Sequence, residues 1–486
     1  MNFTTIIEQI GAVAVHGNAD VEVASVCIDS REASGGSCFV ALGGTQADGH
    51  AFIADAVRRG AVAVVCRELP RELDPSVCYA VAKCSSCAAG LAAAAFYGNP
   101  SRELALVGVT GTNGKTTTAT LLYHLFSALG YKVGLISTVA YFVNDEQLEA
   151  THTTPDAATI NRLLRRMVAC GCAYCFMEVS SHAIAQRRIA GLRFAGGVFT
   201  NVTHDHLDYH KTFEEYIRAK KAFFDDLPPE AFALTNADDR NGRVMVQNSK
   251  AQVKTYALRT PADFKCRIVE QRLDGMLLEV NGTELWTRLI GDFNAYNVSA
   301  ICGAAILLGA PRGEVLRIVS TLGAVAGRFE YVRSRGGLTA IVDYAHTPDA
   351  LKNVLGTLNR LRRSGQKITT VVGCGGDRDR TKRPIMARVA AEGSDRLVLT
   401  GDNPRSEAPQ DIISEMYAGL DDDARRKTLS IVERREAIKA AVMLADKDDL
   451  ILVAGKGHEC YQIIGKEKRH FDDRETLQEV FAELGK

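Results

Sequence analysis

From Leu104 onward, short apolar runs rich in β-branched residues alternate with longer amphipathic stretches. This alternation is typical of β–α units built around a mostly parallel sheet. The sequence therefore predicts an α/β protein. The runs expected to form strands, each followed by a polar loop, are 104–110, 132–138, 174–180, 197–203, 339–345, 368–374, 396–401 and 450–455.

The chain has 486 residues, too many for a single hydrophobic core. A turn-forming segment, Tyr97-Gly98-Asn99-Pro100-Ser101, precedes the first strong strand and indicates one boundary. Glycine-punctuated sequence between Gly323 and Gly327 indicates a second. We therefore expect three domains, comprising residues 1–98, 99–326 and 327–486.

Charge and composition exclude several classes of protein. Lys plus Arg and Asp plus Glu both number 58, and no basic run is present, so no nucleic-acid surface is expected. The first ten residues do not resemble a signal peptide, and the longest small-apolar stretch, 87–97, is too short for membrane insertion. Thirteen scattered cysteines suit a reducing compartment, so a cytoplasmic protein is predicted.

Residues 107–117, VGVTGTNGKTT, follow an expected strand and open an expected helix at 117–129. Glycines allow backbone N–H groups to surround a phosphate, Lys115 supplies positive charge, and the Thr116 hydroxyl can hold magnesium. Val109 stands where the longer form of this motif has its first glycine, so the loop is a shorter variant. We interpret it as a nucleotide-binding loop in preference to a glycine-rich turn without a ligand.

Further polar groups follow the other expected strands, at the sheet edge where ligands bind in α/β proteins. Glu178 is the candidate magnesium ligand near the phosphate loop. The His/Asp cluster at 204–210 is equally consistent with a metal site and with a hydrogen-bonded loop. Four mixed-charge loops in the last third predict a site for a zwitterionic or polyanionic molecule: 343–348, 375–380, 402–405 and 455–459.

Two pairs of closely spaced cysteines raise the alternative of a metal-binding or redox module. They are Cys84 with Cys87 and Cys172 with Cys175, in helical and strand-like contexts rather than tight knuckles. We therefore prefer buried free thiols.

Across nearly its whole length the sequence closely resembles the Mur ligases. The motifs that carry the resemblance are Asp29-Ser30-Arg31, Gln46-Ala47-Asp48-Gly49, TGTNGKTT, MEVSSH, DHLDYH, Asn294 with Asn297, Gly327-Arg328-Phe329-Glu330, DYAHTPDA, GCGGDRD and GKGHE. The resemblance implies an N-terminal UDP-binding domain, a central ATPase domain with a parallel sheet of the P-loop type, and a Rossmann-like C-terminal domain.

The resemblance also implies roles for particular residues. The ATP-binding set would be Gly111, Thr112, Asn113, Gly114, Lys115, Thr116, Thr117, Asn297, Arg328 and Asp343. Magnesium would be held by Thr116, Glu178 and His206. The UDP-linked substrate would contact Ser30, Thr153, Thr154, Ser180, Gln186 and Arg188. His152 and His50 depart from the pattern of many relatives.

A carbamylated catalytic lysine is a further implication, because the family pattern Tyr-x-x-Ala-Lys matches residues 216–220. Lys220 would then act with Lys115, Glu178 and His206. The residues alone indicate otherwise, because Lys220 and Lys221 lie on an amphipathic stretch, 213–225, where most lysines are solvated.

The reaction implied by the resemblance transfers the γ-phosphate of ATP to the free carboxylate of UDP-MurNAc-L-Ala-D-Glu, and an amine then attacks the acyl phosphate. Asp402-Asn403-Pro404-Arg405 matches the form linked in this family to meso-diaminopimelate. An arginine can hold a distal carboxylate, which lysine lacks, through two parallel hydrogen bonds. We expect Arg378 to bind the proximal carboxylate, and Asp402, Gly455 and Glu459 to bind at the far end.

Three alternatives stay open at this point. The first is an L-lysine-adding Mur ligase, the second a ligase like folylpolyglutamate synthetase, and the third a P-loop ATPase switch without ligase activity. The expected partners are small molecules, with ATP and Mg²⁺ as cofactors, and the expected state is a monomer.

Overall fold

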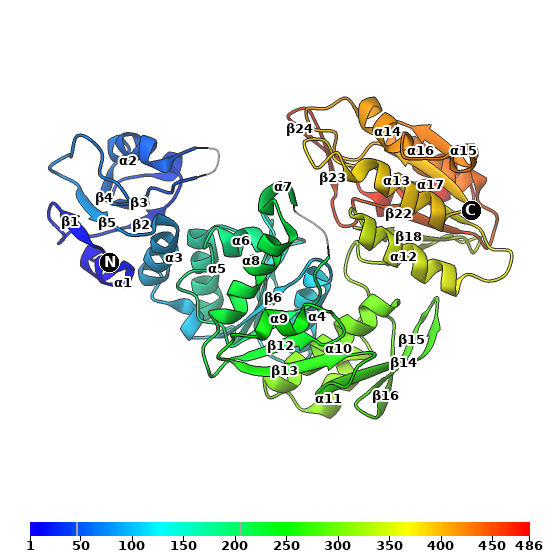
Figure 1. Ribbon diagram of the computed structural model, residues 1–486, viewed down its shortest axis with the longest axis horizontal. Helices are drawn as coiled ribbons and strands as arrows, with labels where there is room; N and C mark the ends of the chain where they lie inside the picture. The colour runs from blue at the N-terminus through cyan, green and yellow to red at the C-terminus, as the bar shows by residue number, and fades with distance from the viewer. Residues whose placement is uncertain (45–46, 204–206) are drawn as a thin grey trace.

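The computed structural model describes residues 1–44, 47–203 and 207–486. Within them the strands form three large sheets and one two-stranded hairpin, each large sheet flanked by helices. The N-terminal and C-terminal domains lie on opposite sides of the central domain (Figure 1). The predicted α/β class is therefore confirmed. No helix among the described residues has both the length and the apolar character needed to cross a bilayer.

The N-terminal sheet has the order β1-β5-β4-β3-β2, with β1 antiparallel to β5 and the other neighbours parallel. Its strands are β1 (Ala14–His16), β2 (Ser25–Cys27), β3 (Ser37–Val40), β4 (Ala61–Cys66) and β5 (Cys78–Val81). Its helices are α1 (Phe3–Ile10), α2 (Ile53–Arg58) and α3 (Ser85–Phe96). A Cβ atom on Gly90 of α3 would lie 2.3 Å from the carbonyl oxygen of Ala190, so small residues let this domain contact the central one.

The central sheet has the order β16-β15-β14-β13-β12-β11-β6-β10-β7-β8-β9. The strands from β14 to β7 are parallel, and the strands outside them are added as antiparallel hairpins. The strands are β6 (Ala105–Thr110), β7 (Val133–Ile136), β8 (Tyr141–Val143), β9 (Glu146–Leu148), β10 (Tyr174–Glu178), β11 (Gly196–Phe199), β12 (Phe232–Asn236), β13 (Gln252–Ala257), β14 (Phe264–Arg272), β15 (Gly275–Val280) and β16 (Thr283–Thr287).

Helices cover both faces of this sheet (Figure 1). They are α4 (Lys115–Ala128), α5 (Ala157–Ala169), α6 (Ser181–Ala185), α7 (Leu207–His210), α8 (Phe213–Asp225), α9 (Gly242–Val246), α10 (Asp292–Leu307) and α11 (Arg312–Val319). On β6, Val107 and Val109 belong to the core beneath α4 and α10, whereas Leu106 belongs to the core on the other face. Burial on both faces explains why this strand is apolar at nearly every position.

The C-terminal sheet has the order β17-β18-β22-β19-β20-β21, with β17 antiparallel to β18 and the other neighbours parallel. Its strands are β17 (Glu330–Arg333), β18 (Thr339–Asp343), β19 (Ile368–Val372), β20 (Arg396–Thr400), β21 (Thr428–Ile431) and β22 (Leu450–Ala454), and β23 (Tyr461–Ile464) with β24 (Glu467–His470) forms the hairpin. The helices are α12 (Pro348–Leu361), α13 (Lys382–Gly393), α14 (Pro409–Tyr417), α15 (Asp422–Arg426), α16 (Arg434–Leu444) and α17 (Asp473–Glu483).

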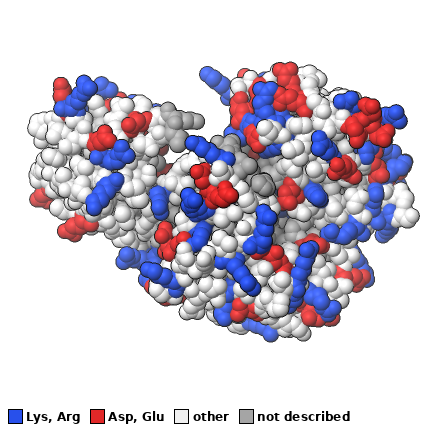
Figure 2. All heavy atoms as spheres, viewed as in Figure 1, with Lys and Arg blue, Asp and Glu red and all other residues white. Residues whose placement is uncertain are grey.

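Each of the eight strands expected from the sequence corresponds to an observed strand, namely β6, β7, β10, β11, β18, β19, β20 and β22. On the face shown in Figure 2, acidic and basic side chains are interspersed over all three domains. The arrangement places the carboxyl ends of β6, β10 and β11, and those of β18, β19, β20 and β22, at the edges that carry the predicted functional loops.

Candidate active site

The loop between β6 and α4 has the geometry of a phosphate-binding loop. Gly111 has φ of 152° and Gly114 has φ of 86°. A Cβ atom on Gly111 would lie 1.9 Å from the Thr200 hydroxyl, and one on Gly114 would lie 2.7 Å from the Asn297 side-chain oxygen. Both positions therefore require glycine, and the loop curls tightly into the N-terminus of α4.

The side chains that follow the loop meet the end of β10. Lys115 Nζ donates to the carbonyl oxygens of Gly111, at 3.0 Å, and Thr112, at 2.9 Å. The Thr116 hydroxyl donates to Glu178 Oε2 at 3.0 Å, and the other Glu178 oxygen accepts the backbone N–H of Thr138 at 2.7 Å. Glu178 is fully buried. The structure thus brings Lys115, Thr116 and Glu178 together, as the sequence predicted.

A hydroxyl and a carboxylate 3.0 Å apart beside a phosphate loop form an oxygen donor set that suits Mg²⁺. The third predicted metal ligand, His206, lies outside the described residues, as do His204, Asp205 and Gln46. Within the described part of the chain, no group of three or more His, Cys, Asp or Glu side chains is arranged to hold a metal ion. The Thr116 hydroxyl and the Glu178 carboxylate would supply two of the oxygen ligands that a magnesium ion prefers.

Lys220 is buried beside the phosphate loop, with 1% of its surface exposed. Its ammonium group donates to the Gly111 carbonyl at 2.9 Å and lies 4.5 Å above the Tyr216 ring. Lys221 instead pairs with Asp225 at 2.6 Å, one turn away on the same helix. The prediction of two solvated lysines was therefore wrong for Lys220, because β6 ends next to this face of α8.

The C-terminal domain contributes two of the predicted nucleotide residues. Arg328 Nη2 donates to the Thr116 hydroxyl at 3.0 Å, and its guanidinium stacks 4.3 Å from the Tyr344 ring centroid. Asp343, at the end of β18, accepts the backbone N–H of Phe329 at 2.7 Å. Burial raises the pKa of Asp343 to about 6, although Arg328 acts in the opposite direction.

Two amides complete the contact with the phosphate loop. Asn297 on α10 accepts the Thr118 hydroxyl at 3.4 Å and donates to Asn294 at 3.0 Å. Asn113, at the tip of the loop, donates to Asp349 of the C-terminal domain at 3.1 Å. The loop is thus held from the central domain on one side and from the C-terminal domain on the other, and Thr117 behind it is buried.

Five of the six residues predicted for the UDP-linked substrate form one group beside Glu178. The Thr154 hydroxyl donates to the Glu178 carbonyl at 2.7 Å and accepts the Ser180 N–H at 3.1 Å, while Thr153 accepts the Thr138 hydroxyl at 3.0 Å. Arg188 donates to the Thr154 carbonyl at 2.7 Å and to Gln186 at 2.7 and 2.9 Å. The sixth residue, Ser30, lies apart in the N-terminal domain, between β2 and β3.

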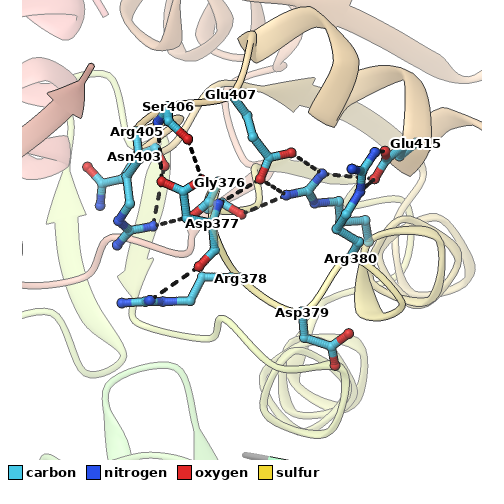
Figure 3. A network of polar contacts seen from close by, with 12 residues as sticks. Gly376, Asp377, Arg378, Asp379, Arg380, Asn403, Arg405, Ser406, Glu407 and Glu415 are labelled. Carbon is cyan, nitrogen blue, oxygen red and sulfur yellow. Dashed lines mark hydrogen bonds and ion pairs between the residues drawn. The ribbon is translucent and has the colours of Figure 1, made fainter. Parts of the chain in front are cut away.

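The loops after β19 and β20 carry the arginines predicted for the amino acid. Gly376 N donates to the Asn403 carbonyl at 2.9 Å, and Arg405 Nη1 donates to the Gly376 carbonyl at 2.7 Å. Figure 3 shows the guanidinium groups of Arg378 and Arg405 on the same side of these loops. Arg378 is exposed, whereas Arg405 is half-buried.

Buried charged groups surround the neighbouring loop after β22, next to Gly455. Lys456 is fully buried, and its Nζ lies 3.2 Å from Asn403 Oδ1, 3.4 Å from Asp402 Oδ1 and 3.5 Å from Glu459 Oε2. Asn403 Nδ2 also donates to Glu459 at 2.8 Å. Burial, followed by the charge of Asp402, raises the pKa of Glu459. Pro404, between Asn403 and Arg405, is buried.

His458 and Lys456 were not predicted as site residues, although both lie in the Gly-Lys-Gly-His-Glu motif. The ring of His458 lies 5.0 Å from that of Tyr344, and its Nδ1 is buried with no hydrogen-bond partner among the described residues. Burial and then the charge of Arg328 lower the pKa of His458 to about 3, while a hydrogen bond with the Thr138 backbone acts against this shift. His458 therefore links the two domains as a neutral imidazole. The sequence signal that could have identified His458 was its position in the loop after an expected strand.

The cysteine pairs differ from the expected buried thiols. Cys84 is exposed at the N-cap of α3, and its Sγ lies 2.7 Å from that of half-buried Cys87. The prediction is wrong for Cys84, because a helix N-cap lies at the domain surface, and it holds for buried Cys172 and Cys175. All 13 cysteines are free.

Known proteins match the chain along almost its full length. The Mur ligase family, catalytic domain matches residues 22–86, the Mur ligase middle domain matches 109–305, and the Mur ligase, glutamate ligase domain matches 327–457. The chain is 58% identical over 482 residues to the UDP-N-acetylmuramoyl-L-alanyl-D-glutamate–2,6-diaminopimelate ligase of Bacteroides fragilis, with 99% of each chain covered.

Two further comparisons agree. A protein of the same name from Bacillus cereus is 40% identical over 492 residues, with 99% of each chain covered. A solved structure of a protein with this name matches with a TM-score of 0.70 at 30% identity and covers 99% of both chains. The chain therefore belongs to the Mur ligase family.

Proposed function

We propose that this protein joins meso-diaminopimelate to the D-Glu carboxylate of UDP-MurNAc-L-Ala-D-Glu, with cleavage of ATP to ADP and phosphate, in peptidoglycan synthesis. One observation carries the proposal. A continuous chain of contacts runs from Thr116, after the phosphate loop, through Arg328 and Tyr344 to His458, and from the adjacent Glu459 to Asn403 beside Arg405. The proposed phosphate site and the proposed amino-acid site would therefore adjoin, as acyl phosphate chemistry requires.

The phosphate loop and its neighbours would position two anions that repel each other. The loop N–H groups and Lys115 would hold the phosphates, with Arg328 reaching them from the C-terminal domain. Asn297 and Asp343 would border the nucleotide. A magnesium ion held by Thr116, Glu178 and, as proposed, His206 would neutralise charge that develops on the transferred phosphoryl group.

The group around Glu178 would present the acceptor carboxylate. Thr153, Thr154, Ser180, Gln186 and Arg188 would hold the peptide end of the UDP-linked substrate, and Ser30 would hold the nucleotide end in the N-terminal domain. Their arrangement supports the proposal, because Arg188 donates to Thr154, and Thr154 donates to the backbone carbonyl of Glu178, a proposed magnesium ligand.

Lys220 would act through carbamylation. We propose that CO₂ adds to its neutral amine with release of one proton, forming a carbamate that would lie beside the phosphate loop and the proposed metal site. Its burial against Gly111 supports this assignment, and the pairing of Lys221 with Asp225 favours Lys220 over its neighbour.

The amino-acid site would select diaminopimelate by its two carboxylates. Arg378 and Arg405 would bind one each, and Asp402, Asn403, Gly455 and Glu459 would bind the distal ammonium group. Lysine would leave one guanidinium unpaired, so it should be rejected strongly. The buried ring of Pro404 supports the turn that brings Arg405 over Gly376.

We also propose domain limits at 1–98, 99–326 and 327–486, since every strand of each large sheet falls inside one of these ranges. A monomer would suffice, because every proposed residue comes from one chain. The cytoplasm is the proposed location, supported by thirteen free cysteines.

Phosphate release from ATP tests the function directly. With UDP-MurNAc-L-Ala-D-Glu present, release should depend on meso-diaminopimelate and should be near background with L-lysine or with no amine. Release with lysine instead would show a lysine-adding ligase. Release with glutamate on a folate substrate would show a folylpolyglutamate-type ligase, and release independent of any acid and amine would indicate an ATPase switch.

A further inference from the structure

Arg383 is a fully buried arginine beneath the two loops that carry Arg378 and Arg405. It lies in the first turn of α13, directly after the loop 373–381, and the second loop, 401–408, leads from β20 into α14. Neither the sequence motifs nor the proposed substrate contacts assign it a role. Burying a guanidinium is costly unless its charge is paired, so the partners of Arg383 need to be identified.

Arg383 holds both loops at once. Its two terminal nitrogens donate to the two oxygens of Glu407, each at 2.8 Å, in the forked geometry that arginine and carboxylate share. Nη2 also lies 3.3 Å from the Gly375 carbonyl of the first loop. A second carboxylate, Glu415 on α14, accepts from Nη1 at 2.8 Å.

Glu407 in turn holds the backbone of the first loop. Its Oε1 accepts the backbone N–H of Asp377 at 2.6 Å while it also accepts from Arg383. The bonds from Arg383, and then the one from the Asp377 N–H, lower the pKa of Glu407 to about 2, so the carboxylate is ionised at neutral pH. Ser406 adds a second tie, with its hydroxyl donating to Asp377 Oδ1 at 2.5 Å.

The anchored loops are strained at two positions that matter for the ligand. Asp377 and Arg405 both have φ of 52°, a left-handed conformation that non-glycine residues adopt only when their surroundings enforce it. Arg378 directly follows Asp377. The first of the two substrate arginines is therefore adjacent to a strained residue, and the second is itself strained. Figure 3 shows Glu407 in contact with Asp377, between the substrate arginines and Glu415.

We propose that Arg383 and Glu407 form a positioning pair, which sets the spacing between Arg378 and Arg405 and thereby makes the amino-acid site selective for a substrate with two carboxylates. The inference rests on the proposed function of that site. Neither residue touches the substrate. They act by holding the backbone of Asp377 and Arg405 in conformations that the two loops would not keep alone, so the second carboxylate meets a guanidinium already in place.

Glu407→Gln tests the pair without leaving the buried charge of Arg383 unpaired, because Glu415 still neutralises it. The amide can replace only one of the two oxygens that Arg383 and the Asp377 N–H use. In the full chain, the KM for meso-diaminopimelate should rise about tenfold or more, the effect of losing one charge-assisted bond that orients a ligand group. The KM for ATP and kcat should change by less than about threefold, and the preference for diaminopimelate over lysine should fall.

Glu415→Gln is the matched control. It removes a carboxylate at the same 2.8 Å distance from Arg383. Glu415 meets the first loop only through the exposed side chain of Arg380, and it accepts no hydrogen bond from the backbone of Asp377 or Arg405. The KM for diaminopimelate should therefore change by less than about threefold. Equal shifts in the two variants, or a fall in kcat with an unchanged KM for diaminopimelate, would overturn the proposal and leave a purely structural ion pair.

A second variant keeps the test independent of folding. Arg383→Lys retains the charge but loses the fork, so it should raise the same KM while circular dichroism stays unchanged. An unchanged KM in this variant would also overturn the proposal. Failure of the proposed function is distinguishable, because it would appear in the wild-type protein as phosphate release that does not depend on diaminopimelate.

Discussion

Replacing Asp343 by asparagine should stabilise the C-terminal domain at neutral pH and lower ligase activity. Burial raises the pKa of this carboxyl from 3.8 to about 6, with Arg328 only partly opposing the shift. At about 1.4 kcal/mol per pKa unit, ionised Asp343 costs the folded state about 3 kcal/mol above pH 6. The asparagine oxygen can keep the N–H of Phe329, but a second backbone N–H, that of Ala345, loses its acceptor at about 1 kcal/mol.

The expected net gain is therefore about 2 kcal/mol at pH 8. Its sign follows from the two ionisations. The unfolded carboxyl loses its proton near pH 3.8 and the folded one near pH 6, so wild-type stability falls as the pH rises between these values and stays low above them. Asparagine does not titrate. The variant should be no more stable than the wild type at pH 4, and its advantage should be complete by pH 7.

The free energy of unfolding of the C-terminal domain can be measured in urea at pH 4 and pH 8. Hydrogen exchange at the backbone amides of β18 reports on this domain separately from the other two. Exposed Asp423, on α15, provides the control, since Asp423→Asn should leave the transition unchanged at both pH values. Phosphate release should fall in Asp343→Asn, because the charge beside Arg328 is proposed to serve the nucleotide site. A loss of stability at pH 8, or a gain that does not depend on pH, would refute the argument.

Three further predictions concern the proposed active site. Lys115→Ala should lower diaminopimelate-dependent phosphate release by at least about a thousandfold with the fold intact, and retention of a tenth of the activity would contradict its role. Arg405→Lys should abolish the use of diaminopimelate while ATP still binds, because lysine cannot make two parallel bonds; unchanged turnover would contradict this. Mass spectrometry in bicarbonate should find the mass of one added CO₂ on Lys220, and the same addition on Lys221 instead would show that the assignment is wrong.

The strands predicted from the sequence are all buried on both faces, although the equally buried strand β12 was missed. Val107 and Val109 on one side of β6, with Leu106 on the other, produce a continuous apolar run that stands out from its surroundings. The hairpin strands β14 and β16 were not predicted, because exposed charged residues such as Arg267, Glu270 and Glu284 interrupt their apolar pattern. Their position is determined by the neighbouring strand, which a local pattern does not contain.

The same distinction applies to the site. Lys115 and Thr116 begin the helix after β6, and Glu178 is the last residue of β10, so strand-end position was enough to find them. Lys220 could not be placed from local pattern, because its partner Gly111 is 109 residues away in the chain. Arg383 likewise appears in sequence as one charge at a helix start. Its burial depends on Glu407 and Glu415, two carboxylates from another loop and another helix.

Arg328 donates to Thr116, and Asn113 donates to Asp349. These two hydrogen bonds join the central and C-terminal domains, and they are made by residues of the proposed nucleotide site. Association of the domains and affinity for nucleotide are then thermodynamically linked, and the linkage is reciprocal: whatever factor the nucleotide contributes to closing the domains, closing them contributes to holding the nucleotide. A small molecule that wedges this junction open would therefore act as an antagonist of nucleotide binding without occupying the phosphate loop.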